Sequence, residues 1–207
     1  MKLFLASDMK HPDSLGKLKG FIGPFEGKKV LYIPTAANGE ICYGGWKMGE
    51  SITLVQTLGF NLEIVELENY RLVNLKEKFE TADIIWMAGG MSGYLLYWLR
   101  RTKCDAFLKD ALENGTVYVG SSAGSTVMSK TICTSEWEIC DKEYGASIIP
   151  GLGYVDFEIY PHFEDSKYDE IMKLWKKGKL YLLKNGEVIT VDGEKIEVLG
   201  EERVIDN

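Results

Sequence analysis

Short apolar runs alternate along this chain with amphipathic stretches of helical period. The apolar runs lie at residues 2–6, 30–34, 62–67, 84–88 and 117–120. The amphipathic stretches between them lie at residues 46–58, 72–79, 94–99 and 106–112. Runs without regular polar positions are typical of strands buried on both faces, and parallel strands need helical crossovers. The pattern therefore predicts an α/β fold, a doubly wound and mainly parallel sheet flanked by helices.

The C-terminal part of the chain has a different pattern. Residues 167–177 have a helical apolar face, and residues 180–183 form a strand-like run. The dipeptides Asn185-Gly186 and Asp192-Gly193 are two-residue hairpin signals beside the strand-like residues 187–191 and 195–199. These signals predict an antiparallel β-hairpin appendage. Because no linker or repeat interrupts the 207 residues, we expect one domain over residues 1–207.

Composition narrows the function classes. No apolar run reaches the length of a membrane span, and the net charge of −7 argues against nucleic acid as a partner. Four cysteines lack C-x-x-C spacing, and the N-terminal residues 1–8 are typical of a first strand rather than a signal peptide, so we expect a cytoplasmic protein. Two histidines make a histidine-based zinc site improbable. We expect no metal or cofactor, and a homodimer stays open.

The segment Gly120-Ser121-Ser122-Ala123-Gly124 follows the last of the strand-like runs and precedes residues that can form a helix. Gly-x-Ser-x-Gly between a strand and a helix is the nucleophile-elbow pattern, in which a tight turn exposes the serine hydroxyl. On this interpretation Ser122 is a nucleophile, and the N–H of Ala123 can stabilise an oxyanion. The alternative is a turn of small residues that packs closely or cradles a phosphate.

Two further segments should reach the same edge of the sheet. Gly89-Gly90 ends the run at 84–88, and Gly90, or else Gly89, is the natural second oxyanion donor; a plain flexible turn is the alternative. His162 follows a strand-like run at 154–160 and a proline, which places it where it could accept the proton of the serine. The other histidine, His11, lies in a polar loop.

A carboxylate that would orient His162 cannot be chosen from the residues alone. Five acidic residues lie in the right part of the chain: Glu136, Glu138, Asp141, Glu143 and Glu164. Glu136 and Glu138 would share a face of an extended segment, which makes them rivals. Glu164, two residues after the histidine, faces solvent if the chain turns there.

The pieces Ala88-Gly89-Gly90, Gly120-Ser121-Ser122-Ala123-Gly124 and Pro161-His162-Phe163, in this order, resemble peptidase E, whose family of serine peptidases also includes cyanophycinase. The resemblance extends from about residue 30 to about residue 177. It implies a fold like that of the class I glutamine amidotransferases, with serine in place of their cysteine. By position it implies a triad of Ser122, His162 and Glu136, with Gly90 and Ala123 as the oxyanion amides.

This chain departs from the family pattern in two respects. Met91 stands where family members commonly have asparagine. Peptidase E cleaves dipeptides with an N-terminal aspartate, which calls for a cation, and this chain has four arginines: Arg71, Arg100, Arg101 and Arg203. The sequence therefore predicts a serine peptidase that acts on small peptides, similar to a dipeptidase. An esterase or other acyl hydrolase on the same elbow, or a non-catalytic module that binds a small molecule, are the alternatives.

Overall fold

A computed structural model describes residues 1–40, 45–69, 75–137 and 142–207 of the chain. Its main sheet has seven strands in the order β3-β2-β4-β5-β1-β8-β9. The five strands from β3 to β1 run parallel, and β8 and β9 add antiparallel pairs at one side. The strands are β1 (Lys2–Ala6), β2 (Lys29–Ile33), β3 (Asn61–Ile64), β4 (Ile84–Met87), β5 (Val117–Ser121), β8 (Val188–Asp192) and β9 (Lys195–Leu199).

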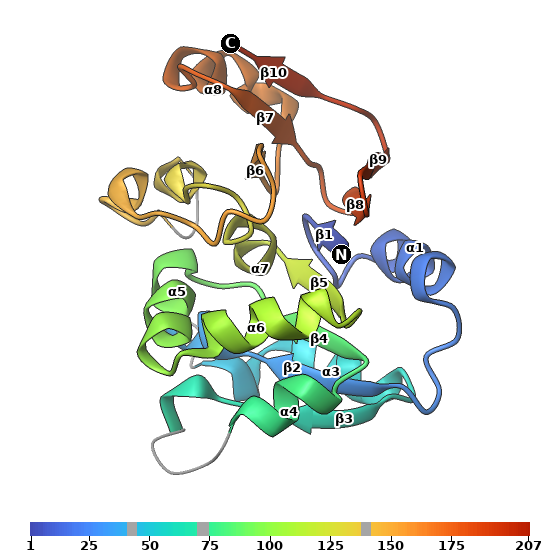
Figure 1. The fold of residues 1–207 in the computed structure, drawn as a ribbon. Coiled ribbons are helices and arrows are strands. Elements are labelled where there is room, and N and C mark those ends of the chain that lie inside the picture. The colour runs from blue at the N-terminus through green and yellow to red at the C-terminus, as the bar shows by residue number, and fades with distance from the viewer. Residues whose placement is uncertain (41–44, 70–74, 138–141) are drawn as a thin grey trace.

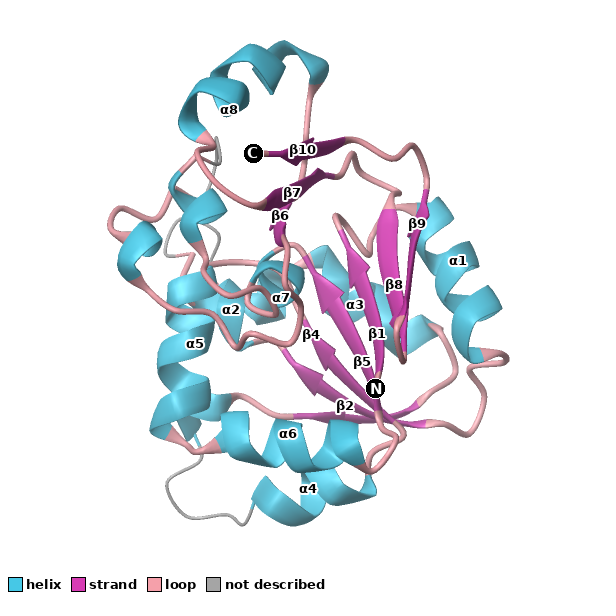
Figure 2. Ribbon diagram, turned by 45° about the horizontal axis from the view of Figure 1, so that its top comes forward, coloured by secondary structure: helices cyan, strands magenta, loops and turns pink. Residues whose placement is uncertain are grey.

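Helices cover both faces of this sheet (Figures 1 and 2). The helices are α1 (Pro12–Ile22), α2 (Thr35–Asn38), α3 (Glu50–Thr57), α4 (Leu75–Thr81), α5 (Ser92–Arg101), α6 (Cys104–Glu113), α7 (Ala123–Thr126) and α8 (Tyr168–Leu174). Successive side chains of β1 alternate between the faces: Leu3 and Leu5 pack in a core with α4, α5 and α6, whereas Phe4 packs in a second core with α1 and α3. Burial on both faces explains why the central strands β1, β2, β4 and β5 are almost entirely apolar.

A second, three-stranded sheet lies beyond the carboxyl ends of the parallel strands (Figure 2). Its strands are β6 (Glu158–Tyr160), β7 (Lys179–Leu182) and β10 (Val204–Asp206), in the order β10-β7-β6. A separate core, with Phe163, Ile171 and Trp175 among its members, joins this sheet to α8. The chain crosses from the small sheet to the main one between β7 and β8.

The structure confirms the predicted α/β class, the mainly parallel sheet and the antiparallel C-terminal strands. Two details differ from the sequence-based expectation. Residues 180–183 do not form a meander with the later strands, because β7 pairs with β6 and β10 while β8 pairs with β1. Residues 125–130 could continue as a helix by sequence, but the helix after the elbow ends at Thr126. His11 lies in the loop before α1, as expected, and it caps that helix, because its Nδ1 accepts from the N–H of Asp13 at 3.3 Å.

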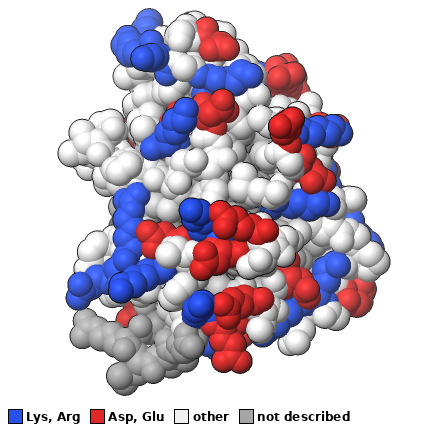
Figure 3. Space-filling view, in the orientation of Figure 1, with Lys and Arg blue, Asp and Glu red and all other residues white. Residues whose placement is uncertain are grey.

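Acidic and basic side chains are interspersed over the face drawn in Figure 3. Among the residues described, no helix has the length and apolar character that crossing a bilayer requires.

Candidate active site

Ser122 lies on the turn between β5 and α7, with φ 48° and ψ −111°. Residues other than glycine rarely adopt this backbone conformation. Neighbouring contacts hold the turn in this shape. The N–H of Ser122 donates to Ala6 O at 3.0 Å, and the hydroxyl of Ser125 donates to the same oxygen at 2.8 Å. Strained backbone of this kind persists only where the surroundings determine it. The structure therefore contains the strand–turn–helix context that the elbow pattern requires.

The two glycines of the elbow are required by close backbone approach. A Cβ on Gly120 would lie 2.6 Å from the carbonyl oxygen of Gly124, across the turn. A Cβ on Gly124 would lie 2.3 Å from the carbonyl oxygen of Met87, at the end of β4. Any larger residue at either position would force the turn apart, which would move the serine.

The glycine pair after β4 lies beside the serine. A Cβ on Gly89 would be 3.4 Å from the Cβ of Ser122, and Gly90 has φ 131° with its Cα packed against the backbone of Ala36. No described residue accepts a hydrogen bond from the N–H of Gly90 or of Ala123. Both amides are thus available to a bound group.

His162 reaches the serine hydroxyl from the end of β6. Its Nε2 lies 3.0 Å from Ser122 Oγ. The histidine has φ 54° and its side chain is exposed, whereas Ser122 is 8% exposed. A hydrogen bond between a serine hydroxyl and an imidazole nitrogen is the geometry that proton abstraction requires. The two residues lie 40 positions apart in the chain.

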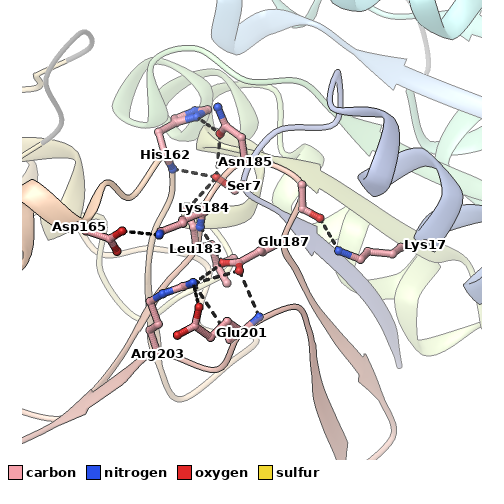
Figure 4. Close-up of polar contacts among 11 residues, drawn as sticks. Ser7, Lys17, His162, Asp165, Leu183, Lys184, Asn185, Glu187, Glu201 and Arg203 are labelled. Atoms are coloured by element: carbon pink, nitrogen blue, oxygen red, sulfur yellow. Dashed lines mark hydrogen bonds and ion pairs between the residues drawn. The ribbon is translucent and has the colours of Figure 1, made fainter.

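The other ring nitrogen of His162 faces an asparagine rather than a carboxylate. Nδ1 lies 2.7 Å from Oδ1 of Asn185, in the turn between β7 and β8 (Figure 4). Glu136 lies in a short 3₁₀ turn, Cys133–Glu136, and its carboxylate accepts from the N–H of Ser147 at 3.0 Å and from the hydroxyl of Ser147 at 2.9 Å. The structure thus brings Ser122 and His162 together and directs Glu136 elsewhere. These hydrogen bonds also hold the pKa of Glu136 below its ordinary value.

The other acidic candidates lie in different surroundings. Glu138 and Asp141 fall outside the described residues. Glu164 is exposed and precedes a 3₁₀ turn. Glu143 is 9% exposed, and its carboxylate accepts from the N–H of Ser92 and, at 2.7 Å, from the N–H of Gly93, the first residues of α5. Its charge therefore stabilises the start of the helix that follows the glycine pair.

The Asn185-Gly186 pattern predicts a hairpin but gives no indication of what the asparagine side chain contacts. A second residue beside the histidine, Ser7, belongs to no motif; it directly follows β1 and is fully buried. The hydroxyl of Ser7 accepts from the N–H of His162 at 2.8 Å. Because sites in parallel sheets form at the carboxyl ends of strands, the position of Ser7 was the signal that could have found it. Within the described ranges, no three His, Cys, Asp or Glu side chains are grouped to hold a metal.

Comparison with known proteins gives one consistent family. Residues 3–199 match the family model described as peptidase family S51. The chain is 27% identical over 200 residues to an uncharacterized peptidase of Listeria monocytogenes, covering 94% of this chain and 96% of the relative. It is 30% identical over 152 residues to a protein named peptidase E from Nostoc, covering 72% of this chain and 58% of the relative.

Solved structures share the fold. One is a crystal structure of a Listeria monocytogenes protein whose name assigns it provisionally to peptidase E. It aligns with a TM-score of 0.81 at 25% sequence identity, and the alignment covers 95% of this chain and 96% of the other. A peptidase from an acI-B1 actinobacterium aligns with a TM-score of 0.69 at 19% identity, covering 99% of this chain and 93% of the other, a likeness of fold alone.

Proposed function

This chain belongs to peptidase family S51 and is a serine peptidase of the peptidase E kind, and on that premise we propose that it hydrolyses small peptides, as a dipeptidase does, with Ser122 as nucleophile and His162 as general base. The observation that carries the proposal is the 3.0 Å contact between His162 Nε2 and Ser122 Oγ on a strained elbow. A structural serine has no need of either feature.

The proposed reaction follows the roles of a serine, a base and two amides. Ser122 Oγ attacks the scissile carbonyl carbon while His162 Nε2 takes the hydroxyl proton. The carbonyl oxygen becomes an oxyanion, which the N–H groups of Gly90 and Ala123 stabilise. Collapse breaks the C–N bond, and the imidazolium donates its proton to the leaving amine. Water, deprotonated by His162, then hydrolyses the acyl-serine and releases the acid.

We propose Asn185 as the third member in place of Glu136. Its Oδ1, 2.7 Å from His162 Nδ1, accepts the proton that Nδ1 carries in one neutral tautomer of the ring. That tautomer leaves Nε2 unprotonated and facing Ser122 Oγ, as a general base requires. Asparagine orients the ring but adds no negative charge to stabilise the imidazolium.

The test combines covalent labelling with substrate turnover. A fluorophosphonate should label Ser122, as located by peptide mass spectrometry, and Ser122→Ala and His162→Ala should each lower dipeptide hydrolysis by several orders of magnitude. Ser129→Ala is the matched control, because Ser129 is a fully buried serine whose hydroxyl has no partner among the described residues.

Three results would contradict the proposal, each in a different way. A folded enzyme that takes up no label at Ser122 would exclude this nucleophile. Turnover of short-chain p-nitrophenyl esters without cleavage of any peptide would favour an acyl hydrolase. Full peptidase activity in His162→Ala would remove the general base while leaving the family assignment intact.

A further inference from the structure

We infer that Ser7 is a positioning residue of the proposed catalytic site. Through its hydrogen bonds, the end of strand β1 fixes the positions of His162 and of the turn that carries Asn185. The inference rests on the proposed function for its catalytic consequence, and on the contacts of one buried hydroxyl for its geometry. Among the described residues, Ser7 forms no hydrogen bond with the side chain of Ser122 or with the imidazole ring of His162.

The Ser7 side chain connects two segments that are remote in the chain (Figure 4). Its Oγ accepts from the N–H of His162 at 2.8 Å. The same hydroxyl lies 3.1 Å from Leu183 O and 3.3 Å from Asn185 Oδ1. Its one hydrogen can be donated to either of these two oxygens. The N–H of Ser7 also donates to Glu187 O at 3.1 Å. One residue thus bonds the backbone of the histidine and both ends of the turn that carries Asn185.

The general need of a buried hydroxyl group for hydrogen-bond partners does not explain this arrangement. Serine side chains commonly bond backbone groups that are near in the chain. The partners of Ser7 Oγ are 155, 176 and 178 residues away, and all belong to the His162 and Asn185 segments. The side chain is 0% exposed, so water does not supply a substitute for these bonds.

The histidine is the residue that most needs such a support. His162 has φ 54°, a conformation that non-glycine residues hold only when surrounding contacts impose it. The bond from its N–H to Ser7 is one such contact, and the bond from the N–H of Phe163 to Leu183 O at 2.9 Å is the next along the chain. Leu183 O, directly after β7, accepts from Phe163 N–H and also lies 3.1 Å from Ser7 Oγ, so the two contacts are connected. Release of the first would let the backbone at His162 rotate and carry the ring away from Ser122 Oγ.

The consequence is selective for the chemical step. Misplacement of a catalytic group by about 1 Å can lower the rate on the order of 100-fold, whereas substrate binding is less affected. We expect Ser7→Ala to lower kcat by about 10- to 100-fold and to change KM by less than about threefold. Ser7→Cys, which keeps the shape of the side chain with a somewhat larger atom and replaces the hydroxyl by a weak acceptor, should lose kcat to a similar extent.

Thr116→Val is the matched control. The hydroxyl of Thr116 is also buried and donates to a backbone oxygen of another segment, Ala82 O, at 3.1 Å. This bond lies at the amino ends of the parallel strands, away from the proposed site. The control loses one comparable hydrogen bond and should keep kcat within about twofold of the parent. Equal losses of kcat in Ser7→Ala, Ser7→Cys and the control would overturn the inference, because the loss would then report general destabilisation.

A second readout does not depend on any substrate. The chain has two histidines, so the ring ¹⁵N resonances of His162 can be assigned by comparison with His11→Gln. In the parent, the ¹⁵N shift of Nδ1 should be that of a protonated, hydrogen-bonded ring nitrogen; in Ser7→Ala and Ser7→Cys this shift should change, and in Thr116→Val it should not. Unchanged ring resonances in both Ser7 variants would contradict the inference. Altered resonances in an enzyme without peptidase activity would support the positioning role and contradict the proposed function.

Discussion

At the scale of single residues, the partner of His162 is the neutral side chain of Asn185, and a charged residue in its place should change the pH dependence of kcat/KM. Asn185→Asp places a carboxylate 2.7 Å from Nδ1, where the charge would stabilise the imidazolium. The base then stays protonated to higher pH, so the acidic limb of the kcat/KM profile should move upward by about one pH unit or more. The profile is measured from about pH 5 to pH 9, with a short peptide as substrate.

The control for this prediction is Asn114→Asp. Asn114 is exposed at the end of α6, before the first residue of β5, and the substitution makes the same change in net charge. It should leave the limb where it is. If Asn185→Asp also leaves the limb unchanged, the asparagine does not face the imidazole in the working enzyme.

At the scale of elements, strand β6 contains a buried acid that the proposed chemistry does not use. Glu158 is 7% exposed; its Oε1 accepts from the N–H of Thr131 at 3.1 Å, and its buried Oε2 has no partner among the described residues. Burial raises its pKa from 4.5 to about 7, against the opposing effects of the Thr131 hydrogen bonds and Lys130. The strand that leads to His162 thus starts with a carboxyl group that resists ionisation.

The sign of the resulting pH dependence follows from this shift. Between pH 4.5 and about 7 the folded state retains a proton that the unfolded state has lost, so the free energy of unfolding falls as pH rises and then levels off. We expect a loss of about 1–2 kcal/mol across this window, allowing for partial solvent screening.

Glu158→Gln should abolish this slope and make the protein more stable than the parent at pH 8. Urea unfolding at pH 5 and pH 8 measures the effect, and Glu164→Gln, at an exposed acid, is the control. A parent whose free energy of unfolding does not fall between these two pH values would contradict the assignment.

At the scale of the whole molecule, an ion pair joins the two sheets. Arg203, next to β10, contacts the carboxylate of Glu187, next to β8, with its Nη1 2.7 and 2.9 Å from the two oxygens, and both side chains are 13% exposed. The same carboxylate accepts from the N–H of Lys184 at 2.8 Å, which closes the turn that carries Asn185 (Figure 4). One carboxylate thus contributes both to the contact between the sheets and to the shape of the turn that carries Asn185.

Breaking the pair from one side should be costly. Arg203→Met leaves a mostly buried carboxylate without its cation, and we expect the free energy of unfolding to fall by about 2–3 kcal/mol. The double variant Arg203→Met/Glu187→Gln removes the orphaned charge and should recover part of this loss. Urea unfolding of the two single variants and the double variant at pH 7 gives the coupling. Strict additivity would mean that the pair contributes nothing.

Acid should weaken the same connection. Burial by itself raises the pKa of Glu187, but hydrogen bonds from Arg203, Lys184 and Glu201 outweigh it and hold the pKa below the ordinary 4.5. The stabilisation is therefore present above pH 4.5 and is lost as pH falls through the lowered pKa of the folded state. A steeper acid unfolding profile in the parent than in Glu187→Gln is the expected result.

The sequence by itself determined the features that depend on local patterns. Short apolar runs alternating with amphipathic stretches predicted the strands of a covered parallel sheet, and the glycines of the elbow, Gly120 and Gly124, lie where a Cβ would collide with backbone. The positions of Ser122 and His162 after strands followed from the same patterns, because the carboxyl ends of parallel strands share one edge. These inferences needed no knowledge of which distant segments meet.

Only the tertiary structure decided what surrounds His162. Asn185 faces the ring because β7 and β8 belong to different sheets, so the Asn-Gly turn crosses between them instead of closing a hairpin. Glu136, near in sequence to the elbow, is held by Ser147 instead. Ser7 reaches the histidine across 155 residues. Local sequence patterns encode secondary structure and turns, whereas contacts of this range depend on how completed elements pack, and no short motif records that packing.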